Sequence, residues 1–304
     1  MVEKELIRVA VIDLGTNTFN LLIAEVNQSK LEYIHSEKLA VLLGMGGINE
    51  GHIADDAMER AKCALTQFKL KCLEKNVQSI KAIGTSALRE AKNAHVLIDF
   101  ALDSLQIPIS IISGLDEAQL IYNGVRCSHP IQHSTLIMDI GGGSTEFIHA
   151  DSTGLLKAVS KNIGVSRIYQ LLGNPDEYSQ NHIEFITDYL NQQKCDFFES
   201  AKSTILVGSS GSFETIFEMT KKMEFPETGY SFELPIDSFV GQLDWLISST
   251  LEQRMNNEWI TSIRKKMIPI AALKMKWVIE QMNIQQVYVS PYSLKEGVFM
   301  SSAS

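Results

Sequence analysis

Hydrophobic residues recur along the chain in two patterns, which together predict an alternating series of strands and helices. Short apolar runs such as 9–12 and 136–140 are typical of buried strands. Residues 54–74 instead carry apolar side chains at helical spacing with charges between them, which predicts a helix packed on a sheet. Further strands are expected at 31–43, 79–83, 109–112, 155–160, 204–207 and 287–290, and further helices from 85, at 115–125, 164–172 and 181–200, and from 293.

A strand, a glycine-rich turn and a second strand follow one another over 136–148. The turn consists of Gly141, Gly142, Gly143 and Ser144, and its missing Cβ atoms allow backbone N–H groups to approach an anion closely. Asp139 and Glu146 flank the turn and would repel a bare phosphate, so we expect a divalent cation between them. The stretch therefore predicts a metal–phosphate site. A dinucleotide-binding fingerprint is disfavoured because Glu146 stands at its sixth position and a strand pattern follows. From one copy alone, a plain hairpin with acidic flanks stays open.

A second copy of this pattern lies near the N-terminus. An apolar strand over 8–12 ends at Asp13, and Gly15, Thr16 and Asn17 precede a further alternating run. Two such hairpins about one domain apart indicate an internal duplication in which each half contributes one phosphate-facing hairpin to a shared cleft. The segment 127–133, which contains Pro130, is the predicted crossing between the halves. We expect an N-terminal domain over 1–127, completed by 290–304, and a C-terminal domain over 128–289.

Four further groups of polar residues are ambiguous from spacing alone. Arg89 follows a predicted helix start and could simply pair with Glu90 on the surface. Asp116 and Glu117 stand in a first helical turn, where acids commonly answer the helix dipole, although a catalytic carboxylate would look the same. The remaining two groups are the small-residue loop with Gly208, Ser210 and Gly211, which could bind phosphate or only cap a helix, and the basic run 264–266, which is normally a solvated face.

Composition narrows the classes of function. The chain has 304 residues, 45% of them hydrophobic, which is enough for two globular domains, and its formal net charge of −9 argues against a general nucleic-acid binder. No signal-peptide core or membrane-spanning run is evident, so we expect a cytoplasmic protein without membrane contact. The 4 cysteines lie far apart without metal spacing, which indicates free thiols rather than zinc ligands or disulfides.

Taken together, these motifs resemble those of one family, the exopolyphosphatase and guanosine pentaphosphate phosphatase (Ppx/GppA) family. The resemblance covers essentially the whole chain, and the fourth of its five blocks is the most specific. It implies an α/β fold, the duplicated ribonuclease-H-like (actin-like ATPase) fold, with two domains and an interdomain cleft. It also implies Mg²⁺-dependent release of terminal phosphate from polyphosphate or guanosine pentaphosphate. The blocks stand at 12–19, 84–89, 112–118, 138–146 and 208–212.

The resemblance also assigns roles to individual residues. Glu117 matches the family's general base, and Arg89 matches its phosphate-binding arginine. Asp139 and Glu146 match the carboxylates on the metal side, with Asp13 as a further metal partner. Phosphate-binding positions are implied at Gly15, Thr16 and Asn17, at Gly141, Gly142, Gly143 and Ser144, and at Gly208, Ser210 and Gly211.

This chain also departs from the family pattern. Where the family has Gly-Leu-Arg-Glu-Gly, residues 293–297 read Ser-Leu-Lys-Glu-Gly after Tyr292, so a lysine replaces an arginine fork. The small-residue signature around 269–273 and the helical C-terminal extension of longer members are absent, which favours short polyphosphate chains or nucleotides as substrates. A homodimer is one expected form. Two rival functions remain open, namely an ATP-dependent kinase or ATPase of the same fold and a non-catalytic sensor of guanosine tetra- or pentaphosphate.

Overall fold

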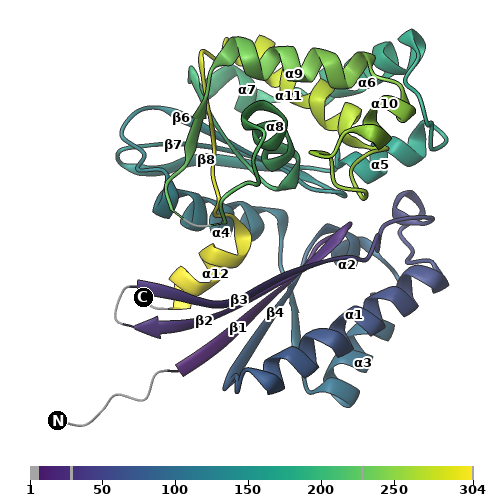
Figure 1. The fold of residues 1–304 in the computed structure, drawn as a ribbon, viewed down its shortest axis with the longest axis vertical. Coiled ribbons are helices and arrows are strands. Elements are labelled where there is room, and N and C mark those ends of the chain that lie inside the picture. The colour runs from purple at the N-terminus through teal and green to yellow at the C-terminus, as the bar shows by residue number, and fades with distance from the viewer. Residues whose placement is uncertain (1–6, 28–29, 228, 303–304) are drawn as a thin grey trace. The chain divides into compact units, whose positions relative to one another are not determined.

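The computed structural model describes residues 7–27, 30–227 and 229–302 (Figure 1). The chain divides into two compact units, which we call unit 1 (Met1–Ser113 with Val298–Ser304) and unit 2 (Gly114–Gly297). The predicted domains divide after residues 127 and 289, whereas the compact units divide after Ser113 and Gly297. The predicted domain boundaries therefore stay a prediction. Within the described ranges, no helix is both long and apolar enough to cross a bilayer.

Unit 1 is built on a five-stranded sheet in the order β3-β2-β1-β4-β5. The first three strands are antiparallel neighbours, and β4 and β5 continue the sheet parallel to β1. Apolar residues of α1 and α3 pack with those of β1 and β2 in one buried core, as the helical spacing over 54–74 predicted. The elements are β1 (Ile7–Leu14), β2 (Thr18–Asn27), β3 (Lys30–Ala40), η1 (Ile48–Glu50), α1 (Asp55–Glu74), β4 (Ser79–Gly84), α2 (Ser86–Glu90), α3 (Ala94–Leu105) and β5 (Ile109–Ile111).

Unit 2 contains a six-stranded sheet in the order β10-β11-β9-β6-β7-β8. Here too three antiparallel strands, β6 to β8, come first along the chain, and β9 and β11 join β6 as parallel strands. Figure 1 shows α6, α9 and α11 on one side of this sheet and α4 on the other. The elements are α4 (Gly114–Ser128), β6 (Thr135–Ile140), β7 (Thr145–Asp151), β8 (Gly154–Lys161), α5 (Val165–Leu171), α6 (Gln180–Gln192), α7 (Asp196–Ser200), β9 (Ile205–Ser209), α8 (Gly211–Lys221), β10 (Phe232–Leu234), α9 (Ile236–Ser248), α10 (Leu251–Asn256), α11 (Ile268–Met282), β11 (Gln286–Val289) and α12 (Leu294–Ser302).

The two sheets repeat one topology, because β3-β2-β1-β4-β5 in unit 1 corresponds to β8-β7-β6-β9-β11 in unit 2. The predicted duplicated α/β fold of the ribonuclease-H-like type is therefore confirmed. The last helix, α12, belongs to both units, since its first turn up to Gly297 falls in unit 2 and the rest, from Val298, falls in unit 1.

One predicted helix was wrong. Residues 181–200 form two helices, α6 and the short α7, because the chain takes an extended conformation at Cys195 (φ −151°, ψ 173°). The break allows Phe197 and Phe198 to pack against Phe147 of β7, with ring centroids 6.4 and 5.0 Å from it. Tertiary packing of these rings therefore overrides the helical periodicity that runs through the segment.

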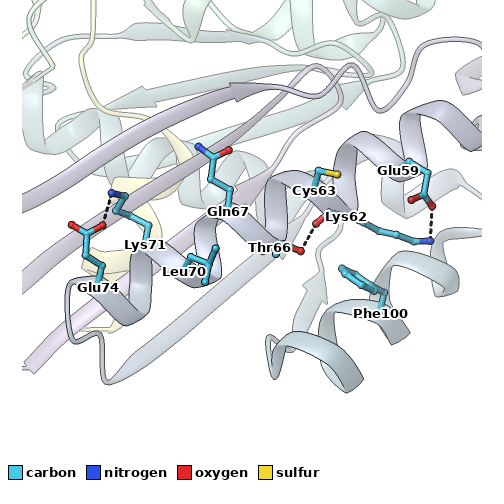
Figure 2. A pocket seen from close by; sticks show the side chains of 9 residues that line it. All are labelled: Glu59, Lys62, Cys63, Thr66, Gln67, Leu70, Lys71, Glu74 and Phe100. Atoms are coloured by element: carbon cyan, nitrogen blue, oxygen red, sulfur yellow. Dashed lines mark hydrogen bonds and ion pairs between the residues drawn. The ribbon is translucent and has the colours of Figure 1, made fainter.

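A hollow on the surface of unit 1 lies along α1 and reaches Phe100 of α3 (Figure 2). Its polar side chains form ion pairs along the helix, Lys62 with Glu59 at 2.8 Å and Lys71 with Glu74 at 2.6 Å. None of the predicted site residues lines this hollow. Exposed ion pairs of this kind contribute little to stability. We therefore interpret the hollow as a solvated face of α1.

Arg254 joins three loops of unit 2 from within the core. The side chain is 0% exposed. Its guanidinium donates to the backbone oxygens of Ser249 at 2.5 Å, Asp176 at 2.6 Å and Lys265 at 2.7 Å. Burial lowers the pKa of this guanidinium from its usual value. Carbonyl oxygens rather than a carboxylate therefore compensate the buried charge.

We expect Arg254→Met to lower the free energy of unfolding by about 3 kcal/mol or more, because it leaves three carbonyl groups unpaired. Arg126→Met is the matched control: Arg126 is exposed, and its replacement should change stability by no more than about 0.5 kcal/mol. Urea denaturation followed by circular dichroism measures both. Equal stabilities of the two variants would contradict the structural role of Arg254.

Candidate functional site

The predicted site residues lie where parallel strands end. In unit 1, Asp13 stands near the end of β1, and Arg89 lies in α2 just after β4. In unit 2, Asp139 stands near the end of β6, Ser209 ends β9, and Ser293 follows β11. Since the carboxyl ends of parallel strands meet at one edge of a sheet, each unit gathers its polar residues at one edge.

Asp139 is the centre of the unit 2 cluster. Its Oδ2 accepts hydrogen bonds from the hydroxyls of Ser209 and Ser293, both at 2.6 Å. The residue is only 8% exposed, and burial raises the pKa of its carboxyl, while the two hydroxyl donors act in the opposite direction. Three strand ends that are far apart in sequence, those of β6, β9 and β11, are thereby joined through one carboxylate.

Glu146 lies directly opposite Asp139 in the β6–β7 pair. It is 1% exposed, and its Oε1 accepts a hydrogen bond from Ser160 of β8 at 2.6 Å. Opposite residues of an antiparallel pair project to the same face, so the two carboxylates share one environment. The two acids predicted on either side of the turn are therefore neighbours across the strand pair, and their metal-binding role stays a prediction.

A buried lysine contacts the residue that precedes Glu146 in β7. Lys274 of α11 donates to Thr145 Oγ1 and, at 2.7 Å, to the backbone oxygen of Ile163. Burial lowers the pKa of its ammonium to about 7, and the charges of Glu146 and Asp139 act against this. Nothing in the sequence pattern distinguished this lysine from the others of its helix.

The glycine turn packs on the start of α5. The carbonyl oxygens of Gly141, Gly142 and Gly143 accept hydrogen bonds from the backbone N–H groups of residues 164–167, at 2.9 to 3.3 Å. Contact is so close that a Cβ on Gly164 would lie 2.2 Å from the carbonyl carbon and oxygen of Gly142. The turn therefore satisfies the N–H groups at the start of this helix, which a side chain or a ligand would otherwise bind.

This contact determines the direction in which the backbone N–H groups of the turn point. In a planar trans peptide the N–H group points away from the carbonyl that shares its plane. Because three successive carbonyls face α5, the N–H groups of Gly142, Gly143 and Ser144 point to the other side. Successive N–H groups with a common direction form an anion-binding concavity.

The loop after β9 differs from its prediction. Gly208 lies inside β9 rather than in a turn, and the ring of Phe213 occupies the space that a side chain would need, 2.0 Å from a Cβ there. Ser210 has φ 82°, and its hydroxyl donates to the backbone oxygen of Ile140 at 3.2 Å. Gly211 begins α8, where Arg264 packs against it.

The basic run 264–266 is not simply a solvated face. Arg264 Nη2 lies 3.3 Å from Glu214 Oε2, and its Nη1 donates to Thr215 at 3.0 Å. Both partners belong to α8, so Arg264 fixes the start of that helix. Lys266 is exposed and pairs with Asp176 at 2.7 Å, as the surface interpretation predicted.

In unit 1, the first hairpin carries a similar carboxylate. Asp13 Oδ2 accepts a hydrogen bond from Asn20 Nδ2 at 2.9 Å, and Asn20 Oδ1 is buried with no hydrogen-bond partner among the described residues. The turn is held by its carbonyls: Thr16 accepts from the backbone N–H of Gly44, and Asn17 accepts from those of residues 41 and 42. Gly15 donates to the backbone oxygen of Thr18 at 3.1 Å, as Gly141 does to Ser144.

Sequence spacing left the roles of Arg89 and Glu117 undecided, and the structure shows what surrounds each of them. Arg89 Nη1 donates to the backbone oxygen of Ile112 at 2.9 Å, which ties α2 to the end of β5. Glu117 is buried in the first turn of α4, whereas the neighbouring Asp116 is exposed. A helix-dipole role requires no burial, so the buried position favours a functional role for Glu117.

The donors around Asp139 fit a hard cation only in part. Across the described ranges, no three His, Cys, Asp or Glu side chains come together as a metal-binding group. Mg²⁺, however, is commonly held by one or two carboxylates and completed by water and substrate phosphates. Asp139 and Glu146 would supply such carboxylates next to the N–H groups of the turn.

Sequence reasoning missed three polar residues around the hairpin. Ser209 lies within the small-residue loop that begins at Gly208, and Ser293 stands at the predicted start of the last helix. The helix does begin after Ser293, and Glu296 of its first turn accepts the backbone N–H of Ser293 at 2.8 Å, while the Ser293 hydroxyl donates to Asp139. Lys274 was missed altogether, because its apolar sequence neighbours do not distinguish it from Lys276 of the same helix.

The fold and the site define the class of protein. It is a duplicated ribonuclease-H-like protein in which each unit places a hairpin turn and a carboxylate at the carboxyl edge of its sheet. Comparison with known proteins then shows the family. The sequence profile of the Ppx/GppA phosphatase family matches residues 22–304, and the chain belongs to this family.

One relative of known structure supports the same family, and a more distant one shows the same fold. An exopolyphosphatase from Cytophaga hutchinsonii is 33% identical, with 97% of both chains covered and a TM-score of 0.93. The Ppx/GppA family member from Aquifex aeolicus has the same fold at 22% identity, with 98% of this chain and 97% of that chain covered and a TM-score of 0.81.

A curated relative belongs to the same family. It is the guanosine-5'-triphosphate,3'-diphosphate pyrophosphatase of Pseudoalteromonas atlantica, and it is 26% identical over 292 residues, or 95% of this chain. This chain spans 57% of that protein's length. Together with the family match, these relatives show that the chain is a hydrolase.

We expect Gly164→Ala to displace the glycine turn, because its new Cβ would meet backbone atoms of Gly142 and Gly143 that cannot rotate away. The variant should lose roughly 2 kcal/mol or more of stability, with large shifts of the Gly142 and Gly143 amide resonances in NMR spectra. Gly241→Ala is the control, since its Cβ would meet nothing within 4 Å in α9 and should stabilise the helix by up to about 1 kcal/mol. Unshifted turn resonances in Gly164→Ala would contradict the packing argument.

Proposed function

We propose that this hydrolase releases terminal orthophosphate from polyphosphate or guanosine pentaphosphate by in-line attack of water on the terminal phosphoanhydride. Phosphoryl transfer requires positioning and electrostatic stabilisation more than covalent chemistry. The observation that carries the proposal is the direction of the Gly142, Gly143 and Ser144 N–H groups, which face away from α5 next to a buried carboxylate pair. A terminal phosphate has the charge and the acceptor oxygens for this concavity.

The glycine turn of the second hairpin, Arg89, the two carboxylates and Asp13 keep their predicted roles in this proposal. The turn N–H groups would bind equatorial phosphate oxygens, and Arg89 would bind phosphate as the family resemblance implies. Asp139 and Glu146 would hold Mg²⁺, which supplies charge stabilisation to the phosphate when bound. Asp13 would take part from the first hairpin, where the unpartnered Asn20 Oδ1 provides a further acceptor for ordered water.

Glu117 is the proposed general base. Its buried carboxylate would orient the attacking water and accept its proton as the oxygen–phosphorus bond forms. The leaving group then departs as the shortened polyphosphate or as guanosine tetraphosphate, and a cation held by Asp139 and Glu146 would offset its negative charge.

The names of the relatives support the substrate class. One solved relative is described as an exopolyphosphatase, and a curated one as a pyrophosphatase of guanosine-5'-triphosphate,3'-diphosphate. Both substrates end in a phosphoanhydride-linked phosphate, which is the feature that the turn could bind.

One assay tests the proposed reaction. Phosphate release is measured from long polyphosphate, short polyphosphate, guanosine pentaphosphate and ATP, each with and without Mg²⁺. The proposal expects metal-dependent release from at least one of the first three. ATP consumption that depends on an added acceptor would instead show a kinase, and tight binding of guanosine pentaphosphate without turnover would show a sensor.

We expect Glu117→Gln to reduce phosphate release by roughly a hundredfold or more, because the amide cannot accept the proton from water. Asp116→Asn is the matched control in the same helical turn, and it should retain wild-type activity because Asp116 is exposed. Steady-state kinetics on the best substrate, with unchanged circular dichroism spectra, measures the effect. Activity of Glu117→Gln within about threefold of wild type would remove Glu117 from the role.

A further inference from the structure

Ser293 is a polar residue of unit 2 to which the proposed mechanism gives no role. It directly precedes α12, and its hydroxyl donates to Oδ2 of Asp139 at 2.6 Å. Ser209 donates to the same oxygen at 2.6 Å, but Ser209 is the register partner of Asp139 in the β6–β9 pair and belongs to the same sheet. Ser293 instead reaches Asp139 from the connection between β11 and α12.

Backbone contacts at the start of α12 determine where Ser293 lies. Glu296 accepts its N–H at 2.8 Å, and Gly297 donates to its carbonyl oxygen at 3.1 Å. The same carbonyl oxygen lies against α4, where a Cβ on Gly124 would come within 2.0 Å of it. A Cβ on Gly297 would in turn overlap the backbone oxygen of Leu120 in α4. Because these are backbone atoms that cannot rotate away, Ser293 has little room to move relative to α4.

The two hydroxyls also determine which oxygen of Asp139 could bind a cation. A carboxylate oxygen accepts about two hydrogen bonds, and Oδ2 already accepts one from Ser209 and one from Ser293. Oδ1 is then the oxygen that a cation would bind. With one donor alone the carboxylate could swing about that hydrogen bond, whereas two donors from different elements restrict its rotation.

We propose that Ser293 is a positioning residue that holds the Asp139 carboxylate so that Oδ1 is presented to a divalent cation. Hydrogen bonds that orient a metal ligand raise metal affinity, because a ligand that is free to rotate must lose that freedom when the metal binds. The close packing of α12 on α4 keeps the hydroxyl in place. This inference rests on the proposed metal site at Asp139 and Glu146.

A merely structural role is the competing explanation. In that case the Ser293 hydroxyl would only compensate a buried carboxylate, and its loss would lower stability without changing cation affinity. Ser293→Ala removes the hydroxyl, and Ser293→Thr retains it. Ser128→Ala is the matched control, since Ser128 is buried in the same unit but its hydroxyl bonds the backbone oxygen of Val125 and the hydroxyl of Ser290.

The test measures Mn²⁺ binding by electron paramagnetic resonance on the full chain, with no substrate present. We expect Ser293→Ala to bind Mn²⁺ about tenfold more weakly than wild type or worse, Ser293→Thr to stay within about threefold of wild type, and Ser128→Ala to bind as wild type does. Wild-type or tighter binding by Ser293→Ala would overturn the proposal, and so would an equal loss in Ser293→Thr or Ser128→Ala. Mn²⁺ binding that Asp139→Asn leaves unchanged would overturn the metal site and this inference with it.

A second variant leaves the hydroxyl in place and moves it. Gly124→Ala would push the carbonyl of Ser293 away from α4, so it should weaken Mn²⁺ binding by about threefold or more, and unchanged affinity would overturn the role of the α4 contact. Phosphate release by the wild type is scored separately. A hydrolase whose Mn²⁺ affinity ignores Ser293→Ala would sink the inference alone, whereas weaker Mn²⁺ binding by Ser293→Ala without any hydrolysis by the wild type would sink the proposed function alone.

Discussion

The burial of two carboxylates at opposite positions of one strand pair is the constraint on which the unit 2 site depends. Asp139 and Glu146 face the same side of the sheet with almost no solvent to screen them. Buried charges of one sign are tolerated only when hydrogen bonds or opposite charges compensate them. The two serine hydroxyls at Asp139 and the hydroxyl of Ser160 at Glu146 provide this compensation, and they come from three separate strands or connections.

The glycine turn compensates another set of polar groups, the N–H groups at the start of α5, with backbone carbonyls alone. A helix N-terminus ordinarily leaves N–H groups for a ligand, but here those of α5 are taken by the carbonyls of the turn. The positive end of the helix is thereby not exposed to the ligand. Instead, the start of α5 orients the three peptide groups of the turn by binding their carbonyls. The N–H groups of the same peptides then point away from the helix. Precision at this turn comes from the close backbone contact at Gly164, and no charged side chain is required for it.

The hydrophobic pattern predicted most of the fold, because the strands and helices that pack on the sheets carry clear periodicity. Both hairpins, the duplication and the facing acids Asp139 and Glu146 followed from it, and the family resemblance is confirmed. The prediction of a single helix over 181–200 was wrong because the hydrophobic periodicity continues across a break that aromatic packing imposes. Ser209, Ser293 and Lys274 could not be predicted, since their partners lie 70, 154 and 129 residues away and no local pattern encodes such contacts. The roles of Glu117 and Arg89 stay predictions.

The division of α12 between the units has a consequence for biosynthesis. Unit 2 is one continuous stretch, Gly114–Gly297, whereas unit 1 includes Val298 and Phe299, both buried, from the last helix. Domains made early on the ribosome usually fold first. Here unit 1 cannot be completed until its final contacts leave the exit tunnel, even though most of it is made before unit 2. Unit 2 therefore has its whole sequence available before unit 1 does, and Val298 and Phe299 are buried residues of unit 1 that are made only after unit 2.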